Sequence, residues 1–264
     1  MENAVAAKMS FLGSGRSGTR KQAFFLFLKQ SHFLVGLAKA LRGLKRDMRV
    51  LFWLAKRPGL ITTYVRSQGV KKLQLGTSNN LLEGWLNTDI TPNHSSVVYL
   101  DATRRFPIDD NTLDYIICEH MIEHIPYHDA QTMLRECHRV LKPGGRVRFA
   151  TPDLRVLLSL HSREKTDAQR DYIEWAIKRF MPDTQECKDV FVINNFFQSW
   201  GHCFLYDQET LHHALHNAGF LEINFYKPGV SEDPNLRNLE FHGKELQCED
   251  INQFETIVVE GYKK

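Results

Sequence analysis

The chain has 264 residues, enough for one large domain or for one domain with a smaller appendage. Its 42% hydrophobic and 25% charged residues are ordinary globular usage and exclude wholesale disorder. The net charge of +3 conceals an asymmetry, because residues 1–72 hold 15 Lys and Arg against 2 acids, whereas the rest hold 19 against 29. We therefore expect a basic N-terminal extension, residues 1–70, before an acidic domain, residues 71–264.

The cysteines and the first apolar run indicate in which compartment of the cell the protein is located. Five cysteines form no CxxC pair and their number is odd, which indicates reduced thiols in a cytoplasmic protein. The apolar run 23–28 is stopped by Lys29 and Gln30, so it is too short for a membrane span and a poor signal-peptide core. The sequence therefore predicts a cytoplasmic protein.

A glycine-rich stretch lies near the start of the chain. Residues 13–19, GSGRSGT, match GxGxxG and resemble the phosphate-binding turn of sulfotransferases. No convincing apolar strand precedes the stretch, and Arg20 stands where a phosphate loop has Ser or Thr after Lys. We favour a tail without a ligand over a phosphate site.

Residues 34–57 have the pattern of an amphipathic helix that ends at Pro58 and Gly59. Apolar residues recur every three or four positions, at Leu34, Leu37, Leu41, Leu44, Met48, Leu51 and Ala55. Basic residues flank this seam, at Lys39, Arg42, Lys45, Arg46, Arg49 and Lys56. We favour a helix packed on the domain or on a second subunit. The alternative is peripheral contact with an anionic membrane at its inner face, or with an acidic substrate.

The stretch 71–89, KKLQLGTSNNLLEGWLNTD, predicts a nucleotide site. A short buried-strand pattern breaks at Gly76 into a polar loop, and the next apolar run ends on Asp89. Glycine lets the backbone approach a ligand, and a strand-end carboxylate can accept both hydroxyls of a ribose.

The pattern repeats along the chain. Residues 96–100 form a predicted strand that ends at Asp101, where a carboxylate can accept from the amine of an adenine. The predicted strand 113–118 follows, then a helix from Asp129 and a strand at 146–150. This alternation predicts an α/β fold with a doubly wound parallel sheet.

Four of these pieces in order carry a resemblance. The pieces are the turn at Leu75 and Gly76 with its downstream acid, Asp101 followed by Ala102, the segment FPIDDNTLDYIICEHMIEHI, and the segment LRECHRVLKPGGRVRFATPD. Together they resemble class I S-adenosylmethionine-dependent methyltransferases. The nearest group shares the small-molecule methyltransferase domain of quinone-biosynthesis enzymes. The resemblance implies a Rossmann-like, mostly parallel seven-stranded sheet, S-adenosylmethionine as cofactor, and methyl transfer to a small-molecule, glycan or lipid-linked acceptor. The acidic domain makes nucleic acid a disfavoured partner.

The resemblance also implies which residues bind the cofactor. Leu75, Gly76 and Thr77 would contact the methionine portion, and Asp89 the ribose. Asp101 and Ala102 would contact the adenine, and Glu119 the far side of the donor. Ser78 and Ile90 complete the predicted cofactor-binding set. The family's loop usually reads Gly-x-Gly, and Ser78 occupies the place of the second glycine. A non-catalytic module that binds S-adenosylmethionine is therefore the second hypothesis.

Residues 120–124, HMIEH, also spell HxxEH, the inverted zinc-protease signature. Pro126 leaves barely one helical turn for two zinc-binding histidines. We expect no metal. Instead, we expect His124 and Glu123 to cap or pack the next helix, or His120 to line the donor pocket.

Residues 154–206 form a predicted acceptor-side insertion with a helix at 167–180 and an aromatic-rich segment at 190–206. Its candidate acceptor-contacting groups are Asn194, Asn195, Trp200, His202 and Tyr206. His202 is our candidate general base, because an acceptor hydroxyl must lose its proton; the alternative is a histidine hydrogen-bonded inside the insertion. His120 is the second catalytic candidate.

The C-terminal part completes the sheet. Asp207 is a predicted cap for a helix that ends at Gly219, and 221–226 and 255–262 are predicted antiparallel strands. Three histidines of that helix are expected to face solvent, His212, His213 and His216. The loop 233–242 is expected to send three side chains toward the acceptor, Arg237, Glu240 and His242.

Overall fold

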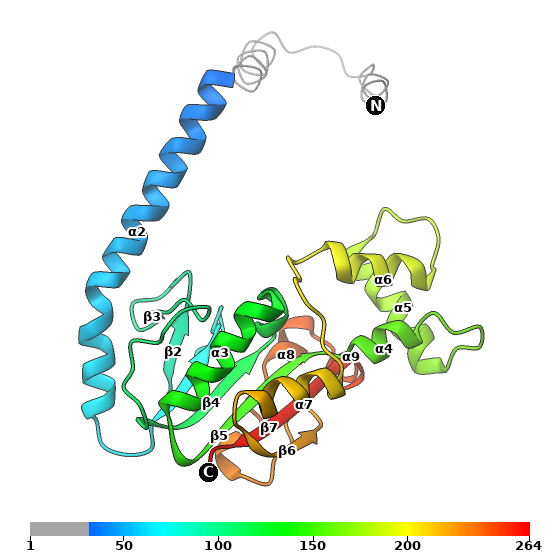
Figure 1. The fold of residues 1–264 in the computed structure, drawn as a ribbon. Coiled ribbons are helices and arrows are strands. Elements are labelled where there is room, and N and C mark those ends of the chain that lie inside the picture. Colours follow the sequence, from blue (N-terminus) through cyan, green and yellow to red (C-terminus); the bar gives the residue numbers. More distant parts are fainter. Residues whose placement is uncertain (1–31) are drawn as a thin grey trace. The chain divides into compact units, whose positions relative to one another are not determined.

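The computed structural model describes residues 32–264 (Figure 1). The chain divides into two units between Phe52 and Trp53. All five cysteines are free thiols. The glycine-rich stretch 13–19 lies outside the described residues. No helix within residues 32–264 combines the length and the apolarity that a membrane crossing needs.

The first unit contains the N-terminal part of helix α2, His32–Arg66. The amphipathic helix predicted here is present. Its apolar stripe is 47–65% exposed, at Leu37, Leu41, Leu44, Met48 and Leu51. Packing of the stripe on another surface stays a prediction.

The predicted end of this helix at Pro58 is wrong, because α2 continues through Pro58 to Arg66. A proline inside a helix costs about 3 kcal/mol through a lost hydrogen bond and a steric clash. Burial beyond the proline offsets this cost, since Ile61 joins the hydrophobic core and Leu60, Tyr64 and Val65 pack against it. The Tyr64 hydroxyl also donates to the Lys72 carbonyl at 2.8 Å, which ties the helix to the first strand.

Seven strands form one sheet, as predicted, and their order is β3-β2-β1-β4-β5-β7-β6. Five neighbouring strands are parallel, and β7 runs antiparallel between β5 and β6. The strands are β1 Lys72–Leu75, β2 Leu86–Asp89, β3 Val98–Tyr99, β4 Leu113–Glu119, β5 Leu141–Pro152, β6 Leu221–Tyr226 and β7 Thr256–Tyr262. The strand order reverses between β1 and β4, and such a crevice is where open α/β sheets bind ligands.

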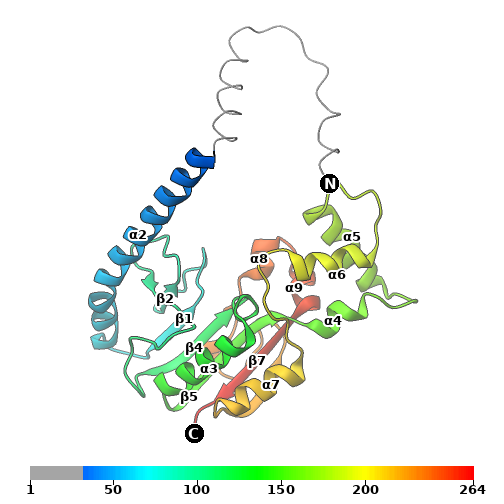
Figure 2. The ribbon, with the colours of Figure 1, turned by 45° about the horizontal axis from the view of Figure 1, so that its top comes forward.

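The helices separate into two groups (Figures 1 and 2). Helices α3 and α7 lie against the sheet, whereas α4, α5 and α6 extend beyond it, with α8 and α9 close to the start of β7. The bounds are α3 Tyr127–Val140, α4 Leu154–Ser159, α5 Asp167–Phe180, α6 Asp189–Gln198, α7 Gln208–Asn217, α8 His242–Leu246 and α9 Glu249–Glu255. The helix predicted at 167–180 is confirmed, and Asp207 caps α7 as predicted, accepting from the Thr210 amide at 2.8 Å.

Two hydrophobic clusters support these groups. The larger one packs the sheet against α3, α7 and the end of α2. The second one lies within the insertion and joins α4, α5, α6 and α9 through residues such as Leu157, Tyr172, Phe196 and Ile251. The insertion is therefore a small packed layer with a core of its own.

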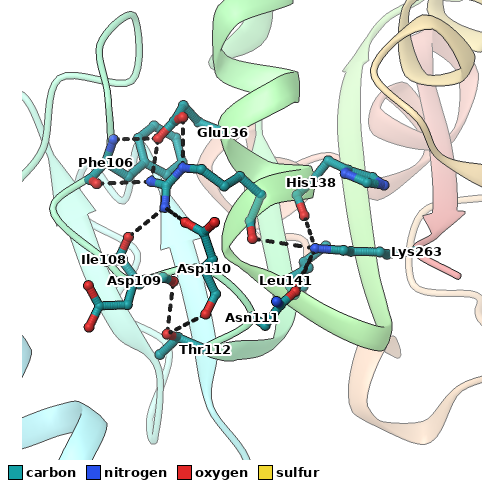
Figure 3. A network of polar contacts seen from close by, with 11 residues as sticks. Phe106, Ile108, Asp109, Asp110, Asn111, Thr112, Glu136, His138, Leu141 and Lys263 are labelled. Atoms are coloured by element: carbon teal, nitrogen blue, oxygen red, sulfur yellow. Dashed lines mark hydrogen bonds and ion pairs between the residues drawn. The ribbon is translucent and has the colours of Figure 1, made fainter.

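Arg139 of α3 fixes the turn that leads into β4 (Figure 3). Its guanidinium donates to the carbonyls of Phe106 and Ile108 at 3.1 and 2.9 Å and pairs with Asp110 at 2.6 Å. Lys263 donates to carbonyls at the end of α3, including that of His138 at 2.7 Å. These contacts tie the turn and the chain end to α3, and so hold β4 in place.

A buried ion network fixes the segment before α8. Arg148 of β5 is fully buried and pairs with Glu240 and Glu260 at 2.5 Å each. Glu240 also accepts from the Gly229 amide at 2.9 Å. The expectation that Glu240 reaches the acceptor is therefore wrong, because its carboxylate is used inside the fold. Arg237 likewise donates to backbone carbonyls of its own loop.

Candidate active site

Three adjoining cavities lie at the carboxyl ends of β1 to β5. The strand-end cavity, about 250 Å³, lies beside the ends of β1, β2 and β3. The loop cavity, about 140 Å³, lies between the turn after β1 and the start of α8. The aromatic cavity, about 440 Å³, lies against the insertion. Gly76 lines the first two, His120 and His242 line the last two, and His124 lines the first and third, so the three meet around these residues.

The strand-end cavity brings together most of the residues predicted to bind the cofactor. Its wall includes Leu75, Gly76, Asp89, Ile90, Asp101 and Ala102. Thr77, Ser78 and Glu119 line the adjoining loop cavity instead. The nine predicted residues therefore surround one continuous region where β1, β2, β3 and β4 end.

The turn after β1 requires glycine at its first position. Gly76 has φ +67°, and a Cβ there would lie 2.5 Å from Cγ of Met121. Ser78 has φ +45°, in the left-handed region that favours glycine. The turn therefore has a left-handed backbone at the position where the resembling family has its second glycine. The Ser78 amide donates to Oδ2 of Asp89 at 3.0 Å, so the turn and the next strand end hold one another.

The two strand-end carboxylates are oriented by the turns that follow them. Oδ1 of Asp89 accepts from the amide and the hydroxyl of Thr91, at 2.7 and 3.0 Å. Oδ1 of Asp101 accepts from the same two groups of Thr103, at 3.0 and 2.6 Å. Each carboxylate is thus fixed in direction while it faces the cavity, which suits it to accept hydroxyl or amine hydrogens.

Glu119, at the end of β4, holds the start of α8. Its Oε1 accepts from the amides of Phe241 and His242, at 2.7 and 2.8 Å. Burial raises the pKa of Glu119, and the two amides act in the opposite direction. His242 thereby lines both the loop and the aromatic cavities, as expected for an acceptor-side residue.

Aromatic rings of the insertion form the wall of the aromatic cavity. The rings are Tyr172, Trp175, Phe180, Phe196 and Trp200. Trp200 packs edge-on against Phe180 and Phe196, with ring centroids 4.9 and 5.5 Å apart. Of the predicted acceptor-side residues in the insertion, Trp200 and His202 line this cavity. Asn194, Asn195 and Tyr206 do not.

His202 has a defined tautomer. Its Nδ1 lies 2.8 Å from the Phe196 carbonyl, which can only accept, so Nδ1 carries the hydrogen and Nε2 keeps its lone pair. Burial lowers the pKa of His202, which keeps the imidazole neutral at physiological pH. His202 therefore presents a basic nitrogen.

His120 belongs to a chain of ionisable groups in which the two histidines are half-buried and the two glutamates are buried. Its Nδ1 lies 3.2 Å from Oε1 of Glu123, and its ring stacks on His242 with centroids 3.7 Å apart. Nε2 of His242 lies 3.1 Å from Oε1 of Glu255. Burial opposes protonation of His120, but the carboxylates of Glu123, Glu255 and Glu119 together outweigh it and raise the His120 pKa.

The expected capping role of Glu123 and His124 is wrong. Helix α3 has Pro126 at its N-cap and no side-chain capping bond. Residues Ile122–His124 form a single 3-10 turn, too short to hold two histidines one helical turn apart on an α-helix. Glu123 is fully buried instead and accepts from the Thr151 hydroxyl at 3.0 Å.

Several cavity residues were not predicted. They include Tyr172, Trp175, Arg179 and Phe180 of α5 and Glu255 of α9. Helix α5 was predicted, but its apolar face gave no signal to distinguish a cavity wall from a core. Glu255 is remote in sequence and reaches the site only through the β7 pairing.

Comparison with known proteins identifies part of the chain. Residues 57–149 match the family model described as a methyltransferase domain. A ubiquinone biosynthesis O-methyltransferase of Pseudomonas syringae is 32% identical over 66 residues, 25% of this chain and 26% of that protein. A demethylmenaquinone methyltransferase of Staphylococcus epidermidis is 37% identical over 73 residues, 28% of this chain and 29% of that protein. The aligned part thus spans less than a third of the length of these curated relatives.

Solved structures give a weaker likeness. An S-adenosylmethionine-dependent methyltransferase of Archaeoglobus fulgidus has a TM-score of 0.45 at 16% identity, covering 81% of this chain and 94% of that one. A possible histamine N-methyltransferase of Thermotoga maritima has a TM-score of 0.42 at 14% identity, covering 86% and 96%.

Proposed function

We propose that this chain, in which residues 57–149 carry a class I S-adenosylmethionine-dependent methyltransferase domain, transfers a methyl group from S-adenosylmethionine to a small-molecule acceptor. The observation that carries the proposal is the meeting of the three cavities. A donor with its adenosine in the strand-end cavity and its methionine in the loop cavity would present its sulfonium near His120 and His124, where the aromatic cavity begins.

We assign the donor contacts as the sequence predicts. Asp89 would accept from the ribose hydroxyls, and Asp101 from the adenine amine, with Ala102 against the ring and Ile90 in the cavity wall beside Asp89. Gly76 would let the backbone approach the methionine portion. The donor is already activated, so the protein contributes mainly proximity and orientation.

The acceptor we propose is a hydroxylated ring. A cavity of about 440 Å³ lies within the usual range for small-molecule sites, and its aromatic wall suits a flat ring. The two curated relatives are named for quinone biosynthesis, which agrees with a phenolic or quinol-type ring. A sugar ring or a lipid-linked ring would occupy the same cavity, and the experiment below distinguishes a lipid-linked acceptor from a water-soluble one.

An acceptor hydroxyl must lose its proton as the carbon leaves sulfur. We propose His202 and His120 as catalytic residues, because both line the aromatic cavity. Nε2 of His202 is the basic atom. It can act as a proton acceptor or as a ligand to a cation, and the next section argues for the second role.

The first unit supports a peripheral position at the cytoplasmic face of a membrane. The exposed apolar side chains of α2, among them Leu41 and Leu44, lie on the same helix as the exposed Lys39, Lys45 and Arg49. Such a helix binds anionic lipid through both its apolar and its basic residues. This placement would suit a lipid-linked acceptor.

The test is incubation of the purified chain with methyl-labelled donor and a cell extract divided into organic and aqueous fractions. We expect label in a low-mass product, and its fraction assigns the acceptor to the lipid-linked or the water-soluble class. Donor binding without transfer in either fraction would instead support the non-catalytic module. Absence of donor binding and of label, together with a sulfate-transfer activity that is lost when residues 1–20 are removed, would support the sulfotransferase-type alternative.

A further inference from the structure

Three ligating side chains converge on the wall of the aromatic cavity. One ligand atom each from Glu123, His124 and His202 lies within 4.8 Å of the other two. We infer that these residues form a binding site for a divalent transition-metal cation. The site itself stands on this geometry, whereas its role in activating the acceptor rests on the proposed function.

Glu123 supplies the strongest argument. Its side chain is fully buried, and Oε2 accepts from the Thr151 hydroxyl at 3.0 Å. Oε1 makes no hydrogen bond of standard geometry, and its ion-pair neighbour is Nδ1 of His120 at 3.2 Å. A single histidine leaves lone-pair capacity on this buried carboxylate oxygen unused, and a bound cation would take it up.

His202 is held as metal-binding histidines usually are. Ligating imidazoles almost always donate their second N–H to a carbonyl or carboxylate, which fixes the ring and the tautomer. Here Nδ1 of His202 donates to the Phe196 carbonyl at 2.8 Å, and Nε2 is the nitrogen left for a ligand.

His124 completes the site from the solvent side. Its side chain is exposed, and its ring centroid lies 5.0 Å from that of His202, with the planes tilted by 57°. The 3-10 turn Ile122–His124 places it directly after Glu123. The set differs from the one that the HxxEH pattern suggests, because His120 stacks on His242 and a histidine from the insertion takes its place.

The donor set indicates the kind of cation. Two imidazoles and one carboxylate suit Zn²⁺, Fe²⁺ or Co²⁺, whereas Mg²⁺ and Ca²⁺ prefer oxygen ligands only. Three protein ligands leave coordination positions open toward the cavity. An acceptor hydroxyl that binds there would release its proton to water, as metal-bound water does. Its oxygen then bonds to the methyl carbon as the carbon–sulfur bond breaks, leaving S-adenosylhomocysteine.

The test is cobalt binding by the full chain after removal of metals with a chelator. Co²⁺ bound by histidine and carboxylate absorbs visible light, and Zn²⁺ should displace it. We expect one high-affinity Co²⁺ per chain, and an affinity at least about tenfold lower after His124→Asn or His202→Asn. His124 is exposed, so its variant should fold; far-ultraviolet circular dichroism and the melting temperature check this.

The matched control is His212→Asn. His212 and His216 are exposed on α7 with parallel rings 6.4 Å apart, so they are a competing pair for the cation. Co²⁺ binding that survives His124→Asn and His202→Asn, or that disappears with His212→Asn, would overturn the site. Because the readout is metal binding, a failure of methyl transfer leaves this result intact, and the two proposals fail separately.

Discussion

The two sides of the active-site region are built in different ways. On the donor side, the proposed S-adenosylmethionine contacts lie within three residues of a strand end and rest on the main core. On the acceptor side, the aromatic cavity takes residues from α5, α6, α8 and α9, which rest on a second core. The donor side is therefore specified by local sequence, and the acceptor side by the packing of segments distant in sequence.

The largest expected effect comes from Arg148, a buried residue that supports both the donor side and the acceptor side. Arg148→Met removes the partner of Glu240 and Glu260 and leaves two buried carboxylates unpaired. We expect the free energy of unfolding to fall by about 3–5 kcal/mol, measured by urea denaturation. Arg135→Met on the exposed side of α3 is the control, expected within about 0.5 kcal/mol of wild type. Equal stability of the two variants would show that the network is not needed.

A substitution confined to the donor side should abolish donor binding alone. In Gly76→Ala, the new methyl group meets Met121 in a left-handed turn that itself costs about 1–2 kcal/mol. We expect S-adenosylmethionine affinity to fall by about a hundredfold or more, measured by calorimetry, with Co²⁺ binding retained. Gly59→Ala, where a Cβ meets nothing within 4 Å, is the control. A donor affinity equal in both variants would place the donor elsewhere.

A substitution on the acceptor side should leave the donor untouched. Trp200→Ala removes a ring that lines the aromatic cavity and packs on Phe180 and Phe196. We expect the acceptor KM to rise about tenfold, with donor affinity unchanged. Phe197→Ala, an exposed neighbour that does not line the cavity, should change neither quantity. A change in donor affinity with Trp200→Ala would mean that the two sides are not separable.

The smallest effect concerns the departure from the family's loop. Ser78 is in a left-handed conformation that costs a non-glycine residue about 1–2 kcal/mol, and Ser78→Gly removes this cost. The greater freedom of glycine in the unfolded chain offsets about 0.5–1 kcal/mol of that gain in stability. We expect a slightly higher melting temperature and a donor affinity at least equal to wild type. A weaker affinity would indicate that the serine side chain itself contacts the donor.

Much of the sheet could be predicted from sequence. Alternating strand and helix patterns end in polar residues at the points where parallel strands meet one edge, which is why Asp89 and Asp101 could be predicted to lie together. The helix at 167–180 was also predictable, since Thr166 and Gln169 form a capping box at its start.

The remaining features depend on tertiary contacts. The continuation of α2 past Pro58 depends on burial of Ile61 and Tyr64 against the sheet, which no local pattern encodes. The convergence of Glu123 with His202 depends on how the insertion folds back over β5. A sequence pattern such as HxxEH places its histidines on an ideal helix, and here the backbone forms a 3-10 turn instead.

The central claim is that the strand ends of β1, β2 and β3 bind S-adenosylmethionine through Asp89. Titration of the donor into wild type and Asp89→Asn by calorimetry tests it most directly, since the amide keeps the shape and removes the charge. We predict saturable donor binding to wild type. In Asp89→Asn, we predict that the free energy of donor binding weakens by about 1.5–3 kcal/mol, while the chain remains folded at the temperature of the titration. Equal affinity of the two proteins, or no binding by wild type, would contradict the account.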